Sequence, residues 1–481
     1  MKKKISAIIS FSLLLSMVFL SGCGCKPQVP NYEVSLEVWG LFDDSDTMAK
    51  VISEYKKRNP VIKDIQYKKM TVDSYENDLR DALATGNGPD IFLIHNSWLA
   101  KHQDKLFPAP DSVITPKQVQ DTFVDVVSQD FVKDSKIFAL PLSVDSLALY
   151  FNKGLLNQAG FSSPPRTWAE FDDAVTRMTK VDSFGNIVQS GAAMGASSDA
   201  SPGDGKINRA TDILTAIMMQ AGAQMNDTKT NLATFAEFTD ASLAGKNPIS
   251  PGQAALAYYT KFSNRSNKEY SWNSSMHNSV DSFIEGQTAM TIDYSWLIPK
   301  IQSKAPKMNL GISTLPQNID KSGKGVNLNF ANYWGYAVSK NKTAKADSAS
   351  GGSGKTPATN EQRTGEAWNF IRYLTMPPVA SQGLPRPPAT KESADYDPAA
   401  EYATTQKKPA ARRDLVGVQR NDLLLAPFAE GNIIAKSWSQ PDNLAVEKIF
   451  DDMIENVALK NADPKDAIDN AEKSVNLLIK K

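Results

Sequence analysis

The stretch GPDIFLIHNSW, Gly88 to Trp98, decides the fold class. Its four consecutive apolar residues, Ile91 to Ile94, predict a central strand covered on both faces, because a half-exposed strand would alternate apolar with polar residues. Strand-like and helix-like segments alternate before it, at 34–39, 47–59, 65–69 and 74–85. This order of strand, helix, strand, helix and strand predicts an α/β fold with a mostly parallel sheet.

Length and charge narrow the class of protein. A chain of 481 residues is too long for one hydrophobic core, which favours two lobes. Lys+Arg and Asp+Glu both number 53, and this balance argues against a general nucleic-acid-binding surface. The 41% hydrophobic and 22% charged residues are typical of an ordinary folded protein.

The N-terminus predicts export. Three lysines, Lys2 to Lys4, precede an apolar run at 5–20, which is shorter than the ~20 residues of a membrane-spanning helix. Leu20-Ser21-Gly22-Cys23 then resembles the lipobox of bacterial lipoproteins. We therefore expect a signal peptide at 1–22, a lipid anchor on Cys23 and a tether at 23–33, which would hold an extracytoplasmic body at the cell membrane. The alternative is an anchor helix that is not cleaved.

The sequence carries no recognisable catalytic or metal-binding motif. Both cysteines, Cys23 and Cys25, precede the folded body, so no disulfide or cysteine metal site is expected there. None of the three histidines, His95, His102 and His277, has the spacing of a zinc protease. The segment SGGSGKT at 350–356 lacks the first glycine of a P-loop and predicts a surface loop. We expect no cofactor, no metal and no enzymatic activity.

The rest of the chain continues the α/β pattern. Residues 147–151 predict a strand, and Thr167 followed by Glu170 forms a capping box that predicts the start of a helix. Further helices are expected at 211–221, 232–244, 251–263 and 365–375, with two more within 443–481.

Five pieces of the sequence resemble one family. They are GNGPDIFLI (86–94), LPLSVDSLALYFNKGLL (140–156), TWAEFDDAV (167–175), FIEGQTAMTIDYSW (283–296), and YWGYAVSKN with EAWNFIRYLT (333–341 and 366–375). In this order, behind a lipobox, they resemble the family 1 extracellular solute-binding proteins of ABC importers, the group that includes the maltose-binding protein. The Ser/Gly-rich segment near Ser350 and the Pro-rich segment at Gly383 depart from the pattern.

The resemblance implies a periplasmic-binding-protein-like fold. Two discontinuous α/β lobes would be joined by a hinge, with the ligand in the cleft between them. By the matching pieces, lobe 1 would take 34–143 and 309–376, and lobe 2 would take 144–308 and 377–481. A lobe that is discontinuous in sequence requires the chain to cross the hinge more than once.

Aromatic and polar residues gather where the expected strands begin or end, which is where open α/β lobes bind ligands. An aromatic ring can pack on the apolar face of a pyranose, while carboxylates and amides bind its hydroxyls. The candidate ligand-binding residues are Trp39, Asn96, Trp98, Asp145, Asp293, Tyr294, Trp296, Tyr333, Trp334 and Trp438.

Each candidate has a competing structural explanation. Trp296 is the strongest, since the resemblance places a sugar-stacking residue there. Packing and ligand binding explain Trp39 equally well. Trp272 could serve either role. Asp145 could bind a hydroxyl or brace the hinge. Trp168 and Trp368 lie inside helical patterns and are expected in the core.

Together these observations predict a lipid-anchored, monomeric receptor that captures a sugar or oligosaccharide and delivers it to an ABC permease. Two alternatives remain open. One is a surface glycan-binding or lectin-like protein without a transporter. The other keeps the fold and binds a polyamine, a phosphate ester or a peptide, because acids and aromatic rings also suit a cation.

Overall fold

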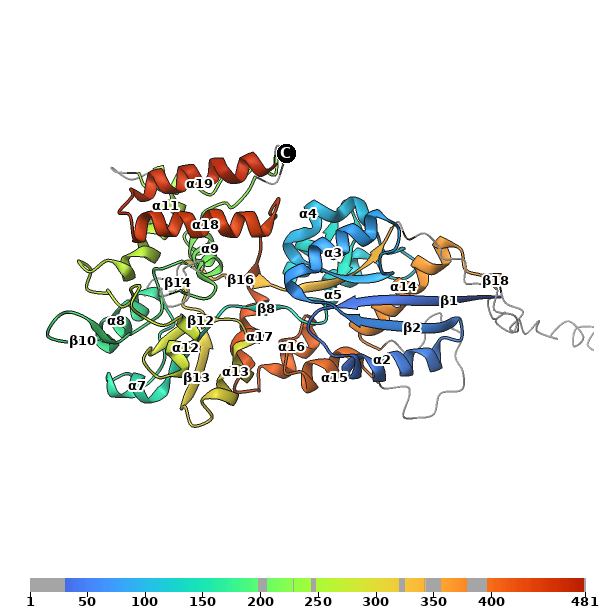
Figure 1. The fold of residues 1–481 in the computed structure, drawn as a ribbon, viewed down its shortest axis with the longest axis horizontal. Coiled ribbons are helices and arrows are strands. Elements are labelled where there is room, and N and C mark those ends of the chain that lie inside the picture. The colour runs from blue at the N-terminus through green and yellow to red at the C-terminus, as the bar shows by residue number, and fades with distance from the viewer. Residues whose placement is uncertain are drawn as a thin grey trace, which may run out of the picture.

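The computed structural model describes most of the chain and divides it into two lobes (Figure 1). The predicted signal peptide, Cys23 and the segments near Ser350 and Gly383 lie outside the described residues. The described ranges are 31–197, 206–227, 229–243, 248–319, 325–340, 342, 356–378 and 396–479.

Two hydrophobic cores define the lobes. In lobe 1 the buried apolar residues come mainly from 34–144, 331–338, 367–376 and 399–416. In lobe 2 they come mainly from 147–315 and 438–475. Figure 1 shows the lobes end to end along the long axis, with the blue N-terminal strands in lobe 1 and the red C-terminal helices on lobe 2.

The sheet of lobe 1 has the strand order β18-β1-β3-β17-β4, with β2 beside β1 and β7 beside β17. Its strands are β1 (Tyr32–Gly40), β2 (Ile62–Lys69), β3 (Ile91–His95), β4 (Leu106–Phe107), β7 (Ala139–Leu140), β17 (Trp334–Ser339) and β18 (Thr356–Pro357). The expected parallel pairing holds between β1 and its neighbours β2, β3 and β18. Strand β17, whose direction the sequence did not predict, runs antiparallel to β3, β4 and β7.

Helices of lobe 1 cover this sheet with amphipathic faces. They include α2 (Ser45–Arg58), α3 (Val72–Ala84), α4 (Leu99–His102), α5 (Pro116–Thr122), α6 (Asp125–Phe131), α14 (Asn360–Thr375), α15 (Pro398–Thr405) and α16 (Arg413–Gln419). Buried residues recur three or four positions apart in α2 and α3, as the periodicity predicted. Trp368 of α14 is fully buried, so its expected place in the core is confirmed.

Lobe 2 has a smaller antiparallel sheet in the order β12-β9-β13. Its strands are β9 (Ala148–Asn152), β12 (Met290–Asp293) and β13 (Leu310–Thr314). Helices of its main core are α7 (Lys153–Gln158), α8 (Trp168–Met178), α9 (Ala210–Gln220), α11 (Pro251–Thr260), α18 (Asn443–Ala458) and α19 (Pro464–Ile479). A smaller core adds α12 (Ser279–Ile284), α13 (Leu297–Lys304) and α17 (Ala426–Ile433).

Three short strands lie side by side where the chain passes between the lobes. They are β8 (Asp145–Ser146), β16 (Asn329–Asn332) and β19 (Ala435–Lys436). Strand β8 carries the chain from lobe 1 into lobe 2, β16 carries it back to lobe 1, and β19 precedes the C-terminal helices of lobe 2, as the expected repeated crossings require. Other short elements are β5 (Val132–Lys133), β6 (Lys136–Ile137), β10 (Lys180–Val181), β11 (Ile187–Gln189), β14 (Asn318–Ile319), β15 (Gly325–Val326), α10 (Asp240–Leu243), and the 3-10 turns η2 (Asn96–Trp98), η3 (Gln103–Lys105) and η4 (Lys261–Ser263).

The expected lobe boundaries need two corrections. Strand β13 lies after the predicted crossing at 309 but pairs with β9 in lobe 2, and the passage to lobe 1 comes only after Phe330. Residues 399–416, expected in lobe 2, pack in the core of lobe 1. Both errors arise because an apolar segment does not reveal from its own sequence which core it joins.

Two helix predictions had opposite outcomes. The capping box of Thr167 and Glu170 is confirmed at the start of α8. The prediction of a helix over 232–244 is wrong, because among the described residues of this range only the single turn of α10 is helical. In the bend before that turn, Glu472 and Asn476 of α19 accept backbone N–H groups of Ala236 and Ala233.

Candidate functional site

A cavity of about 630 Å³ lies between the lobes, within the 300–1,000 Å³ usual for small-molecule sites. Lobe 1 contributes the segments that follow β1 and β3, the first turns of α3, and the start of β17. Lobe 2 contributes the start of α9, residues 294–296, and the segment from Ser437 into α18. A ligand in this cavity would therefore contact both lobes.

Aromatic rings at the ends of three strands of lobe 1 meet on one wall. The Trp334 and Trp98 ring centroids are 4.9 Å apart, and those of Trp334 and Phe42 are 5.9 Å apart, both in edge-to-face contact. Trp334 pairs with His95 in the β17–β3 ladder, which brings it beside the end of β3. Phe42 is 50% exposed, so part of this aromatic wall is open to a ligand.

Lobe 2 faces this wall with further aromatics and unpaired donors. Tyr294, Trp296, Trp438 and Phe450 line the cavity. The indole N–H groups of Trp296 and Trp438 are buried and have no hydrogen-bond partner in the described part of the protein. Since an unsatisfied buried donor costs free energy, both are suited to hydrogen-bond a ligand oxygen.

A charged cluster from the start of α9 and from α18 lies beside these rings. The Arg209 guanidinium carbon is 5.6 Å from the centre of the Tyr294 ring and 6.0 Å from that of Trp296. The Tyr294 hydroxyl donates to Asp212 at 2.9 Å. Desolvation of its carboxyl, together with the charges of Asp212 and Asp451, raises the pKa of Glu447 to about 7. Arg209, Asp212 and Glu447 all line the cavity and combine donors with acceptors.

Sequence reasoning missed this cluster. Arg209 and Asp212 stand at the start of a helix, where such residues usually face solvent, and Glu447 lies in a distant amphipathic helix. One signal was present: Arg209 directly follows the Gly/Ser/Asp/Pro-rich loop region, and loops carry many binding residues. Arg209 also adopts φ = 61°, a left-handed conformation that is uncommon for a residue other than glycine.

Asp145 lines the cavity but its carboxylate is already bonded. Its Oδ2 accepts from the Ser295 hydroxyl at 2.6 Å and from the Ser295 backbone N–H at 3.0 Å. Burial raises its pKa to about 6, although these hydrogen bonds act in the opposite direction. Because β8 lies at a crossing between the lobes, these contacts favour the hinge-bracing alternative for Asp145.

Asn96 and Tyr333 also line the cavity, and both support its wall through Asp130. The Tyr333 hydroxyl donates to Asp130 at 2.7 Å, and the Asn96 amide donates to the same carboxylate at 3.2 Å. His95 lines the same wall and is hydrogen-bonded to Asn332 at 3.1 Å. Burial lowers the His95 pKa to about 4, so its imidazole is neutral at pH 7.

Two candidates do not line the cavity, which corrects their expected position. Asp293 is 0% exposed and accepts from the Asn208 side chain at 2.7 Å, because the last residue of β12 is turned into the interior of lobe 2. Trp39 is 6% exposed in the core of lobe 1, where its indole N–H donates to Glu37 at 2.8 Å. The packing explanation therefore holds for Trp39. Trp168 and Trp272 are buried in lobe 2.

The described part of the chain contains neither a metal-binding cluster nor a membrane-spanning helix. No group of three or more His, Cys, Asp or Glu side chains is arranged to hold a metal ion there. Within the same residues, no helix has both the length and the apolar character needed to cross a membrane.

Two lobes around a mixed aromatic and polar cavity define the class of two-lobed binding proteins. The family model of the bacterial extracellular solute-binding proteins matches residues 50–411, and the chain belongs to this family. The resemblance seen in the sequence is thereby confirmed.

Curated relatives are distant. The multiple sugar-binding protein of Streptococcus mutans is 21% identical over 322 residues, covering 65% of this chain and 70% of its own. The maltotriose-binding protein of Pyrococcus abyssi is 27% identical over 103 residues, 21% of each chain. A putative binding protein of Brucella abortus is 25% identical over 107 residues, which is 22% of this chain and only 24% of that relative's length.

Solved structures share the fold at low identity. A sugar-binding protein of Xanthomonas citri superposes with a TM-score of 0.65 at 16% identity, covering 93% of this chain and 97% of its own. The cyclic alpha-maltosyl-1,6-maltose binding protein of Arthrobacter globiformis gives 0.66 at 17% identity, with 93% and 99% covered. A solute-binding protein of Thermotoga lettingae, bound with alpha-D-tagatose, gives 0.63 at 17% identity, with 92% and 99% covered.

Proposed function

We propose that the protein is the extracytoplasmic receptor of an ABC importer, which captures a sugar or short oligosaccharide between its lobes and delivers it to the permease. The observation that carries the proposal is the interlobe cavity lined by four tryptophans, Trp98, Trp296, Trp334 and Trp438. The receptor acts as a monomer and is held at the membrane by lipidated Cys23. Its role is binding and release, not chemical conversion.

The cavity can bind both the apolar face and the polar edge of a sugar. Indole rings cover the apolar C–H face of a pyranose, as aromatic groups do in small-molecule sites generally. Hydroxyls at the ring edge need both donors and acceptors. The unpaired N–H groups of Trp296 and Trp438 supply donors, and the carboxylates of Asp212 and Glu447 supply acceptors.

The names of the relatives support the same solute class. Those of Streptococcus mutans and Pyrococcus abyssi are named for binding multiple sugars and maltotriose, and the Thermotoga lettingae structure holds a tagatose. At such low identity the particular sugar does not transfer from these proteins to this chain.

A thermal-shift screen tests the proposal, because a ligand that binds only the native state raises the melting temperature. Mono-, di- and trisaccharides should include at least one compound that raises it in a concentration-dependent way. A positive sugar should lose this effect in Trp296→Ala. If no sugar shifts the wild type while another solute class does, the sugar assignment is wrong.

A polyamine is the second candidate, favoured by the charge of the cavity. Its lining includes six carboxylates but only two strongly basic side chains, Arg209 and Lys408; the carboxylates belong to Asp43, Asp73, Glu76, Asp145, Asp212 and Glu447. Acidic and aromatic walls attract cations. Spermidine and putrescine therefore belong in the screen, and a polyamine shift that disappears at high salt would favour this class over a neutral sugar.

A further inference from the structure

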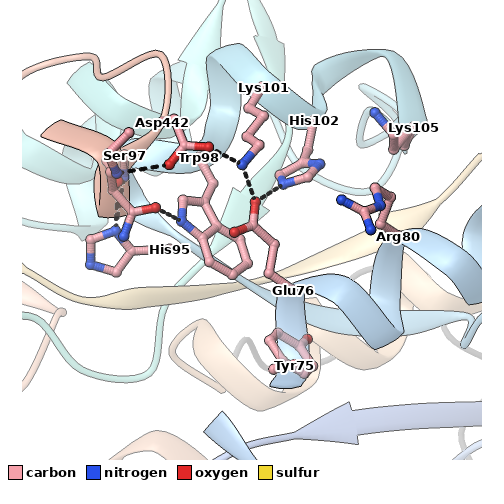
Figure 2. Close-up of polar contacts among 12 residues, drawn as sticks. Tyr75, Glu76, Arg80, His95, Ser97, Trp98, Lys101, His102, Lys105 and Asp442 are labelled. Carbon is pink, nitrogen blue, oxygen red and sulfur yellow. Dashed lines mark hydrogen bonds and ion pairs between the residues drawn. The ribbon is translucent and has the colours of Figure 1, made fainter. Parts of the chain in front are cut away.

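Two polar contacts join the lobes at one side of the cavity. The Trp98 indole N–H of lobe 1 donates to the Asn443 side-chain oxygen of lobe 2 at 2.7 Å. One turn further along lobe 1, the Lys101 ammonium lies 2.7 Å from Asp442. Figure 2 shows Lys101 between Glu76 on its own lobe and Asp442 on the other. We call Lys101, Asp442, Trp98 and Asn443 the interlobe clasp.

Hydrogen bonds and ion pairs within each lobe position both sides of the clasp. Asp442 caps α18, with Oδ1 accepting the Ala445 backbone N–H at 3.1 Å, which leaves Oδ2 for Lys101. On lobe 1, Glu76 accepts from Lys101 at 2.7 Å and from His102 at 2.9 Å. Although burial alone would raise the Glu76 pKa, hydrogen bonds from His102 and Lys101 lower it to about 2. Glu76 is thus ionised at physiological pH and holds the ammonium in position.

The clasp needs the lobes to be close together. Its members lie on η2 and α4 of lobe 1 and at the N-terminal end of α18 in lobe 2, where Asp442 is the N-cap. When lobes rotate apart about a hinge, contacts between them on the cleft side are lost. The side chains of Lys101 and Asp442 are 31% and 35% exposed, so water and salt can compete for each group.

We propose that the Lys101–Asp442 ion pair of the interlobe clasp holds the lobes together before any ligand binds. The ion pair thereby sets the equilibrium between the open and closed forms of the receptor. Its role in transport rests on the proposed function, but its effect on lobe closure does not. A clasp of this kind slows ligand access and ligand release together, because both require opening.

Two conservative variants remove the ion pair and preserve its surroundings. Asp442→Asn keeps an oxygen that can cap α18, since Asn and Asp are equally good N-caps. Lys101→Met keeps the length of the aliphatic chain and leaves Glu76 bonded to His102. The matched control is Asp452→Asn, which removes an ion pair with Lys448 that lies within α18 and does not reach lobe 1.

Small-angle scattering of the ligand-free protein tests the clasp. Both variants should have a larger radius of gyration than the wild type, while Asp452→Asn should match it, with unchanged circular dichroism in all three. High salt, about 1 M, should expand the wild type toward the variants, since the Debye length then falls to about 3 Å. If both variants keep the wild-type radius, the clasp does not hold the lobes and the proposal is wrong.

Binding kinetics give a second test once a ligand is identified. Ligand dissociation should accelerate about two- to five-fold in each variant, the range expected for a partly exposed ion pair, and the double variant should add little. Equal dissociation rates in wild type and variants would also contradict the clasp. Failure of the sugar screen would leave the scattering test unaffected, so the two proposals fail separately.

Discussion

Trp98 and Trp334 lie with their ring centroids 4.9 Å apart and their planes at 74°, although one follows β3 and the other begins β17. This contact forms because β17 runs antiparallel to β3, so its first residue lies beside the last residue of β3. The aromatic wall of the cavity is therefore a product of strand pairing across a long separation in sequence. Four predictions follow from this cavity, its surroundings and the N-terminal sequence.

Trp296→Ala should weaken ligand binding about ten- to hundred-fold, because losing an aromatic face against a ligand costs on the order of 1–3 kcal/mol. Trp296 is partly buried, unlike the fully buried core tryptophans, so the melting temperature of the free protein should change little. Isothermal titration calorimetry and a melting curve measure the two effects.

The matched control for Trp296 is Trp272→Ala. Trp272 is fully buried in the core of lobe 2, and its truncation should cost roughly 3–5 kcal/mol of stability through the cavity it leaves. If Trp296→Ala melts as low as Trp272→Ala while its folded fraction binds normally, Trp296 is a packing residue and the proposed stacking is wrong.

Because of Asp293, the unfolding free energy of the protein should fall as the pH rises through the weakly acidic range. Burial raises its pKa from 3.8 to about 6, so between these values the native state binds more protons than the unfolded state. Stability from this group is then greatest below 3.8 and is lost as the pH rises through about 6, by up to about 2–3 kcal/mol. Asp293→Asn should reduce the slope of the unfolding free energy against pH over this interval. An unchanged slope would show that Asp293 does not titrate there.

Cys23→Ala should abolish lipid labelling in the host and leave an uncleaved precursor, because the predicted lipobox places the modified thiol at Cys23. Metabolic labelling with a fatty acid and the migration of the precursor on a gel measure the result. The control is Cys25→Ala, which should be labelled like the wild type. If Cys23→Ala is still labelled, either Cys25 is the anchor or the lipobox prediction is wrong.

Saturating ligand should reduce the radius of gyration, because contacts with both walls of the cavity exist together only when the lobes are closed. The decrease should be larger for Lys101→Met than for the wild type, since the variant starts more open. Small-angle scattering with and without ligand measures both changes. A radius that ligand leaves unchanged in both proteins would exclude closure by a hinge.

Local patterns in the sequence were sufficient to predict much of the fold. The apolar run at Ile91–Ile94 predicted the central strand, Thr167 and Glu170 predicted the start of α8, and two C-terminal helices were found where expected. These features depend on residues within a few positions of one another, through periodicity and capping. Aromatic residues at strand ends were informative for the same reason, and Trp98, Trp296, Trp334 and Trp438 all line the cavity.

The sequence by itself determined the α/β elements, the two-lobed class and most of the aromatic lining, because these arise from short-range patterns and from a resemblance carried by contiguous motifs. Only the tertiary structure decided that Asp293 is turned into the core, that β13 joins lobe 2, and that Arg209 and Glu447 share one cavity. It also decided the contact of Lys101 with Asp442, which are 341 residues apart. The physical reason is that burial, pairing and charge contacts depend on which distant segment packs opposite a residue, and a residue's neighbours in sequence do not specify that segment.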